Sequence, residues 1–160
     1  SKQVLSLGYC SCDIDQFFHQ ADKGLQQAKK ENWWQAGNHF NKVLSLWKGP
    51  LPSAHFQCED MIMLEDDIVH TLKHIAKIWG PYLQERNLFN EAANIYEKAW
   101  LTDILDQQLA RQLYTLYQQR NDRKRCRVTI KKYREALVKF AYTTEEIEEL
   151  CKELIFAEKP

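Results

Sequence analysis

Two short segments of the chain repeat each other at an offset of 34 residues. Gln84–Asn87 reads Gln-Glu-Arg-Asn, and Gln118–Asn121 reads Gln-Gln-Arg-Asn. The same offset relates a triplet that follows each segment: Ala92, Tyr96 and Ala99 in one copy, and Cys126, Ile130 and Tyr133 in the other. Positions four and then three residues apart lie on one face of a helix. The repeat therefore predicts a chain built from similar helical units.

A third copy of the triplet lies nearer the N-terminus, at Ala36, Phe40 and Val43, 56 residues before the first of the other two. The additional length falls in residues 49–54, whose two prolines and one glycine predict a loop. Two of the three copies carry a glycine twelve residues before the leading alanine, Gly24 and Gly80. A residue without a side chain there would let paired helices approach closely. The remaining copy has Tyr114 instead, so its helices must pack differently.

A period of 34 residues built of paired helices is typical of tetratricopeptide repeats. Each such unit buries its apolar face only against its neighbours, so about three units are needed for a stable stack. The chain has 160 residues, of which 44% are hydrophobic, and this is enough for one helical core. We therefore predict an all-α fold, a tetratricopeptide-like right-handed α-solenoid of about seven helices.

Apolar residues at spacings of three and four, with turn and capping residues between them, predict the limits of these helices. The expected limits are residues 13–30, 33–47, 59–82, 88–100, 106–119, 123–141 and 144–157. Asp13 is expected to begin the first helix, after a short extended segment at Val4–Leu7. Thr143 and Glu146 predict a capping box for the last helix. Pro81 removes one backbone donor inside the third helix, which predicts a bend rather than an end.

Basic and acidic residues balance, with 22 of each, so the formal net charge is zero. A chain that holds DNA by its phosphates needs an excess of positive charge, so direct DNA binding is disfavoured. No apolar stretch approaches the roughly 18 residues of a membrane-spanning helix, and no signal-peptide pattern is present. The five cysteines are odd in number and scattered, which favours reduced thiols and a cytoplasmic location.

Four segments carry a more specific pattern, in the order Leu7–Phe17, Val43–Leu51, Cys58–Trp79 and Ile130–Leu137. The second reads Val-Leu-Ser-Leu-Trp-Lys-Gly-Pro-Leu, which is similar to the "ALxLWRGPL" run of the bacterial transcriptional activator domain. The third is similar to the long acidic and leucine-rich helix that follows this run in the family, and the fourth resembles its "YRRCREAL" segment. The first resembles the junction between a winged-helix domain and this module.

The resemblance implies a non-catalytic regulatory and protein-interaction domain of a bacterial transcription activator, covering residues 13–160. In that family a winged-helix domain precedes the module and binds promoter DNA. Residues 1–12 are therefore expected to be a remnant of such a domain or of a linker, and DNA contact to pass only through the missing domain. The implied partners are that DNA-binding domain, the transcription machinery and another copy of the chain, without a cofactor, small-molecule substrate or membrane. A stand-alone tetratricopeptide adaptor that binds a partner peptide is the alternative.

Two sets of residues are candidates for the partner-binding surface. The first set consists of aromatic residues on the first helix of a pair, since tyrosine is favoured at interfaces. They are Tyr82, Tyr114 and Tyr117. The second set lies on the basic helix and would act through charge. Its members are Arg123, Arg127 and Lys131. The alternative is that the tyrosines pack in the core and the basic residues form a solvated face, as most charged runs on helices do.

His70 and His74 lie one helical turn apart, with Asp66 a further turn back, and this spacing can hold a metal ion. They lie off the apolar stripe of their helix, so a solvated face is the simpler interpretation. Cys10 and Cys12 would supply at most half of a tetrahedral site. The sequence contains no glycine-rich phosphate loop, no nucleophilic serine motif and no carboxylate pair in an apolar setting. We therefore expect neither a metal site nor an enzyme.

Overall fold

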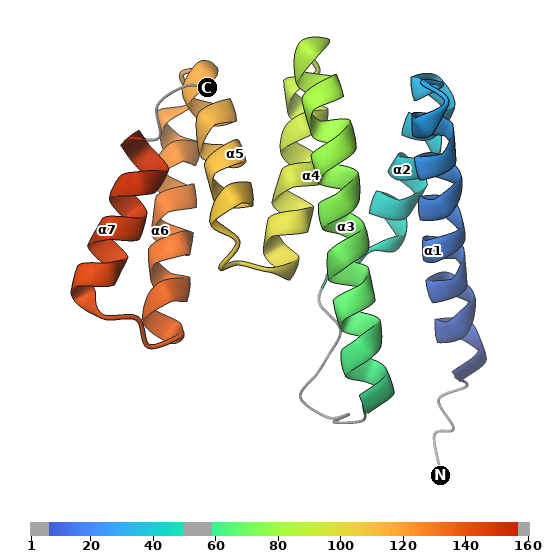
Figure 1. Cartoon of the computed structure of the whole chain (residues 1–160), viewed down its shortest axis with the longest axis horizontal. Coiled ribbons are helices and arrows are strands. Elements are labelled where there is room, and N and C mark those ends of the chain that lie inside the picture. Colours follow the sequence, from blue (N-terminus) through green and yellow to red (C-terminus); the bar gives the residue numbers. More distant parts are fainter. Residues whose placement is uncertain (1–6, 50–58, 157–160) are drawn as a thin grey trace. The chain divides into compact units, whose positions relative to one another are not determined.

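Seven α-helices follow one another in the computed structural model, which describes residues 7–49 and 59–156 (Figure 1). They are α1 (Leu7–Lys29), α2 (Trp33–Leu46), α3 (Glu59–Glu85), α4 (Phe89–Thr102), α5 (Gln107–Gln119), α6 (Arg123–Lys139) and α7 (Thr144–Phe156). The described residues contain no strand, so the predicted all-α class is confirmed. No helix among them is long and apolar enough to cross a membrane.

The predicted helix limits hold to within a few residues except at the N-terminus. α1 begins at Leu7, so the expectation that Asp13 begins the first helix is wrong. The alternation at Val4–Leu7 is a weak signal because a short strand is not stable without partner strands, and Leu7 belongs to the helix instead. Residues 4–6 of that segment lie outside the described residues. α3 continues through Pro81 to Glu85, so the proline does not end the helix, as expected.

The helices group into two compact units, Ser1–Trp79 and Gly80–Pro160. In the first unit α1 packs against α2, and α3 contributes its residues up to Trp79. The rings of Phe40 and Trp79 lie 5.3 Å apart between centroids and join α2 to α3. The side chains without exposed surface in this unit include the predicted triplet and part of α3, namely Ala36, Phe40, Val43, Leu72, Ile75 and Ala76.

The second unit contains the end of α3 and the helices α4 to α7. Within it α5 packs against α4, α6 and α7, and α6 packs against α7. Its core combines small residues with large rings, and the most buried members are Ala92, Ile95, Tyr96, Ala99, Ala110, Leu113, Leu116, Tyr117, Tyr133, Leu137 and Leu154. The α4 triplet predicted from the repeat is therefore in the core.

Two glycines allow paired helices to approach closely, at the positions that the repeat predicts. A Cβ atom on Gly24 would lie 2.5 Å from Cε1 of Phe40, and one on Gly80 would overlap the phenol end of Tyr96. Phe40 and Tyr96 occupy equivalent positions of the repeat. A ring on the second helix of each pair thus packs directly on the backbone of the first.

The third copy of the repeat packs differently, as Tyr114 predicts. The backbone carbonyl of Tyr114 accepts a hydrogen bond from Sγ of Cys126 over 3.8 Å, so the two repeat positions still face each other. Ile130 occupies the position that a ring fills in the other copies, and it is only half-buried. Where the first helix carries a side chain instead of a hydrogen, the second helix therefore carries a smaller and less buried residue.

A residue with left-handed backbone follows the first helix of each repeat pair, and another follows α6. They are Glu31, Asn87, Asn121 and Ala141, with φ of 58°, 60°, 56° and 61°. The Asn121 N–H donates to the Gln118 carbonyl over 3.0 Å, and the next N–H donates to Tyr117 over 2.9 Å, which is the Schellman pattern. The repeated Gln-x-Arg-Asn segment is therefore the last turn of a helix followed by an asparagine that tolerates this conformation.

Side-chain caps begin α5, α6 and α7 of the second unit. Oδ1 of Asp106 accepts a hydrogen bond from the backbone N–H of Leu109 over 2.9 Å, and Asp122 caps α6 in the same way over 3.0 Å. The predicted capping box is confirmed. Oε2 of Glu146 accepts from the backbone N–H of Thr143 over 2.8 Å, and Oγ1 of Thr143 accepts from the backbone N–H of Glu146 over 3.3 Å. The hydrogen bonds from Thr143 lower the pKa of Glu146.

We expect Gly24→Ala and Gly80→Ala to lower the free energy of unfolding by about 1–3 kcal/mol, because the new methyl group overpacks a buried ring. Gly37→Ala is the matched control. Its Cβ would lie 3.3 Å from Cζ2 of Trp79, and alanine gains about 1 kcal/mol of helix propensity over glycine. The control should be neutral or stabilising in urea unfolding. Equal effects of all three substitutions would mean that the predicted close approaches are not the tight points of the packing.

We expect Ala141→Gly to stabilise the protein by about 0.5–1 kcal/mol, because glycine removes the steric penalty of a positive φ. This gain in the folded state exceeds the cost of the additional chain entropy that glycine loses on folding. Asn121→Ala, at an equivalent turn with φ of 56°, should change stability in the opposite direction. Thermal melts of the two variants measure both effects. A destabilised Ala141→Gly variant would contradict the proposed role of these turns.

Candidate functional site

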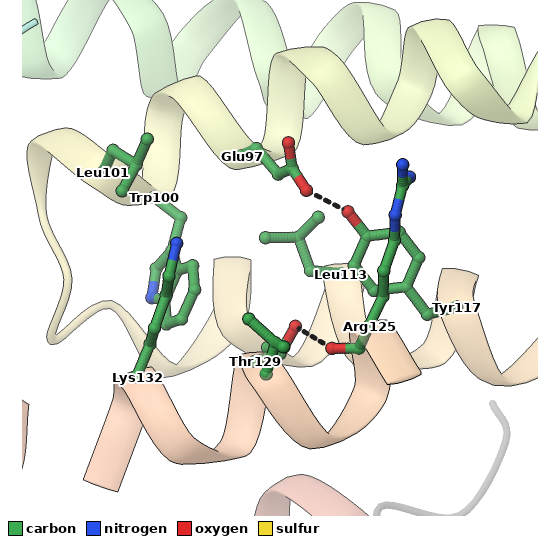
Figure 2. Close-up of a pocket in the computed structure, with 9 residues that line it drawn as sticks. Glu97, Trp100, Leu101, Leu113, Tyr117, Arg125, Thr129 and Lys132 are labelled. Atoms are coloured by element: carbon green, nitrogen blue, oxygen red, sulfur yellow. Dashed lines mark hydrogen bonds between the residues drawn. The ribbon is translucent and has the colours of Figure 1, made fainter. Parts of the chain in front are cut away.

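A small pocket opens between α4, α5 and α6 of the second unit (Figure 2). Its volume is about 100 Å³. Its lining residues are Glu97, Trp100, Leu101, Leu113, Tyr117, Arg125, Val128, Thr129 and Lys132. Pockets that hold cofactors or drug-sized ligands are larger, about 300–1,000 Å³. This one has the dimensions for a single side chain.

The floor of the pocket is apolar and deeply buried. Trp100, Leu113 and Tyr117 are each no more than 3% exposed. Nε1 of Trp100 donates a hydrogen bond to the backbone carbonyl of Ile104 over 3.0 Å, which fixes the orientation of the indole. Leu101 on α4 and Val128 on α6 are each 43% exposed and also line the pocket. An apolar side chain entering here would therefore be covered from two helices.

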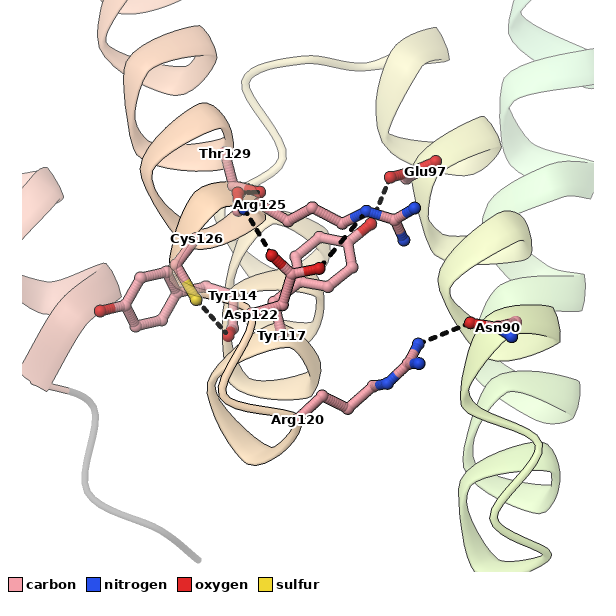
Figure 3. Close-up of polar contacts among 9 residues, drawn as sticks. All are labelled: Asn90, Glu97, Tyr114, Tyr117, Arg120, Asp122, Arg125, Cys126 and Thr129. Atoms are coloured by element: carbon pink, nitrogen blue, oxygen red, sulfur yellow. Dashed lines mark hydrogen bonds and ion pairs between the residues drawn. The ribbon is translucent and has the colours of Figure 1, made fainter.

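The phenol of Tyr117 joins α5 to α4. Its hydroxyl donates a short hydrogen bond to Oε1 of Glu97, and Figure 2 shows the two groups pointing toward each other. Burial, followed by this hydrogen bond, raises the pKa of Tyr117. Because the phenol stays neutral, it remains a donor that holds the Glu97 carboxylate beside the pocket. Nη1 of Arg120 strengthens the same junction by donating to Oδ1 of Asn90 over 2.6 Å (Figure 3).

Two basic side chains line the α6 side of the pocket. The guanidinium carbon of Arg125 lies 5.4 Å from the ring centroid of Tyr117, and Nε of Arg125 lies 3.6 Å from Oδ2 of Asp122. A cation over a tyrosine face is favourable, so Arg125 has a defined position beside the pocket. Lys132 is exposed two turns further along the helix. Oγ1 of Thr129, between them, is directed back to the Arg125 carbonyl over 3.0 Å, leaving its methyl group for the apolar lining.

These α6 residues follow a single helical stripe. We define the pocket face of α6 as Arg125, Val128, Thr129 and Lys132, at positions i, i+3, i+4 and i+7. That spacing places all four on one side of a helix. α6 as a whole carries eight basic residues and one acidic residue, although the whole chain has no net charge. The pocket face therefore presents an apolar centre between two cations.

The basic residues predicted from the sequence lie elsewhere on α6. We define the opposite basic face as Arg123, Arg127 and Lys131, all of which are exposed and outside the pocket. Arg127 is two positions from Arg125, which is about 200° around a helix of 3.6 residues per turn. Nζ of Lys131 pairs with Oε1 of Glu135 over 3.7 Å on the exposed surface. The structure thus does not bring these three residues together with the pocket.

The three tyrosines that the sequence offers as partner-binding candidates do not lie together in one site either. Tyr82 is half-buried, with the guanidinium carbon of Arg86 4.9 Å from its ring centroid. Tyr114 is half-buried, and Figure 3 shows its ring extending away from the Glu97–Tyr117 pair. Tyr117 is 2% exposed, so this tyrosine packs in the core, as the alternative interpretation held. It lies one turn from Leu113 on the apolar face of α5, and its ring forms part of the pocket floor.

Sequence reasoning missed the pocket, although part of its signal is present in the sequence. The stripe of Arg125, Val128, Thr129 and Lys132 has an amphipathic spacing that is readable without a structure. Trp100 and Leu113 could not be assigned to the same site, because their proximity depends on how α4 and α5 pack. A basic helix with no other information indicates only a charged surface.

The described residues contain no group of three or more His, Cys, Asp or Glu side chains that could hold a metal ion. The rings of His70 and His74 lie 6.3 Å apart between centroids, and both residues are exposed. The side chains of Cys10 and Cys12 lie outside the described part of the chain. Cys126 and Cys151 are free and buried.

Comparison with known proteins gives no match to a protein-family model, to a curated protein or to a solved structure. The fold and the pocket are therefore the observations on which a function can be built.

Three buried phenols predict an alkaline transition of the second unit. Burial raises the pKa of Tyr96 and of Tyr133 to about 12, and the pKa of Tyr117 is raised as well. An unfolded tyrosine has a pKa of about 10, so the folded state favours the neutral phenol. This contribution to stability is complete below pH of about 10 and is lost as the pH rises through the folded pKa values.

We therefore expect the free energy of unfolding to fall steeply from a pH of about 10 upward, and Tyr133→Phe to reduce that fall. Urea unfolding at several pH values provides the measurement. Equal slopes for the wild-type protein and the Tyr133→Phe variant would show that the buried phenol does not drive the transition.

Proposed function

We propose that this chain is a non-catalytic regulatory and protein-interaction domain of a bacterial transcription activator, and that it acts from the cytoplasm while an attached winged-helix domain holds the promoter. The observation that carries the proposal is the pocket between α4, α5 and α6, with its buried apolar floor and cationic rim. The resemblance of Val43–Leu51 and of three further segments to the transcriptional activator domain supports the assignment to transcription.

The chemistry of the pocket favours a protein partner. Buried aromatic and aliphatic residues with arginine at the edge are the typical composition of a site that receives an anchoring side chain. Arg125 and Lys132 would attract carboxylates next to that anchor and would increase the rate of encounter. A nucleic-acid phosphate could use these cations but would leave the floor of Trp100 and Leu113 uncovered. The partner that uses both features is an acidic segment with an apolar side chain.

The proposal includes a tetratricopeptide-like stacking of the helix pairs. It is supported by the equivalent packing of Gly24 on Phe40 and of Gly80 on Tyr96, and by the equivalent left-handed turns of the three copies. In such a stack each pair presents one helix face to its neighbours and one to partners. Tyr82, Tyr114 and the opposite basic face remain candidate contributors to partner binding beside the pocket.

A reporter assay tests the function directly. The chain is joined to a sequence-specific DNA-binding domain that does not activate transcription, and output is measured from a bacterial promoter with the matching site. We expect output above that of the DNA-binding domain alone. Arg125→Glu with Lys132→Glu should remove most of it, because the rim then repels an acidic partner.

Arg127→Glu with Lys131→Glu is the matched control, since it makes the same change in charge on the opposite basic face. It should retain the output. If this control loses activity while the pocket-face variant keeps it, the partner site is the opposite basic face. No activation by the wild-type chain would reject the transcriptional role, and a peptide-binding adaptor would be the better description.

A further inference from the structure

An exposed stripe on α3 is complementary to the pocket face of α6. We define the acidic stripe as Glu59, Ile62, Met63 and Asp66. Ile62 and Met63 are 57% and 65% exposed, and both acidic residues are exposed as well. The stripe is on the side of α3 opposite Leu72 and Ile75, which carry the helix into the core of the first unit. The acidic stripe therefore exposes two large apolar side chains to solvent between two carboxylates.

The two stripes share the same spacing. In each, the charged residues are at positions i and i+7 and the apolar lining is at i+3 and i+4, with acids on α3 and bases on α6. Seven residues of helix span about 10 Å, so both carboxylates can reach both cations when the helices lie side by side. The complementarity holds in either helix direction, because each stripe has the same charge at both ends.

We propose that the acidic stripe of one copy of this chain binds the pocket face of a second copy, with Ile62 or Met63 entering the pocket. The inference rests on the proposed function, in which the pocket receives an acidic, apolar protein segment, and it identifies the segment. Binding removes the exposed apolar surface of Ile62, Met63 and Val128 from water. The carboxylates pair with Arg125 and Lys132 at the edge of the contact.

This contact joins two different surfaces, so it is head-to-tail. The pair retains one free stripe and one free pocket, so the assembly grows with concentration unless a ring closes. A contact of two helix stripes is small, so we expect dissociation constants on the order of micromolar and a marked weakening by salt.

Sedimentation of the intact chain over a range of concentrations tests the proposal. We expect the average mass to rise above the monomer value of 19.0 kDa and to return to it in high salt. Glu59→Lys with Asp66→Lys, and separately Arg125→Glu with Lys132→Glu, should each weaken association roughly tenfold or more. Arg127→Glu with Lys131→Glu should associate like the wild-type protein.

A mixing experiment distinguishes head-to-tail binding from other contacts. The stripe-reversed variant, Glu59→Lys with Asp66→Lys, retains a normal pocket. The pocket-reversed variant, Arg125→Glu with Lys132→Glu, retains a normal stripe. Each alone should be monomeric, whereas their mixture should associate, because the normal stripe of one variant meets the normal pocket of the other and the two reversed surfaces also carry opposite charges. A chain that carries both reversals regains opposite charges and should associate again. A mixture that stays monomeric, or a wild-type chain that is monomeric at all concentrations, overturns the proposal.

Arg125 also contacts Tyr117 and Asp122, so a second variant protects the test against loss of folding. Ile62→Asp with Met63→Asp changes only exposed side chains, and it should abolish association while the helical circular dichroism is unchanged. Retained association in this variant would contradict the inference. If the chain is monomeric but the pocket-face variant still lowers reporter output, the proposed function stands with another partner. If the chain associates as expected but the pocket-face variant leaves the reporter output unchanged, the proposed function fails instead.

Discussion

The contact of a ring with a glycine backbone sets the geometry of the first two helix pairs. Gly24 lies against the ring of Phe40 and Gly80 against the ring of Tyr96, so closely that neither position has room for a Cβ atom. Because protein interiors are densely packed, such a contact fixes both the separation and the rotation of the two helices. Ala92 and Ala99 on α4 are then directed into the core, and Glu97 and Trp100 reach the pocket.

The turns determine the direction in which the third pair presents its side chains. Asn121 reverses the chain with φ of 56°, and Asp122 then caps the first turn of α6. The ion pair of Asp122 with Arg125 and the contact of Arg125 with Tyr117 set the rotation of α6 about its axis. As a result the pocket face lies against α4 and α5, and the opposite basic face lies in solvent. The same short segment that marks the repeat in the sequence therefore positions the candidate site.

Local features of the fold were predictable because they depend on a few neighbouring residues. Helix limits, the Thr143–Glu146 capping box and the glycine contacts follow from periodicity, capping chemistry and the repeat. The beginning of α1 was not predictable, because an alternation of four residues does not specify a strand without partner strands. The pocket was predictable only in part. Its basic stripe is visible along α6, but the burial of Tyr117 and the meeting of Trp100 with Leu113 depend on packing between distant helices.

The central claim is that the pocket of the second unit receives an apolar side chain from an acidic segment. Nuclear magnetic resonance of the tryptophan indole N–H groups tests it most directly, by titration of the intact chain with a peptide of residues 59–71. The chain has five tryptophans, and only Trp100 lines the pocket. We expect the Trp100 signal to shift with saturation while Trp34, which is 76% exposed on the first unit, is unchanged. An unchanged Trp100 signal at saturating peptide, or equal shifts of all the tryptophans, would contradict the account.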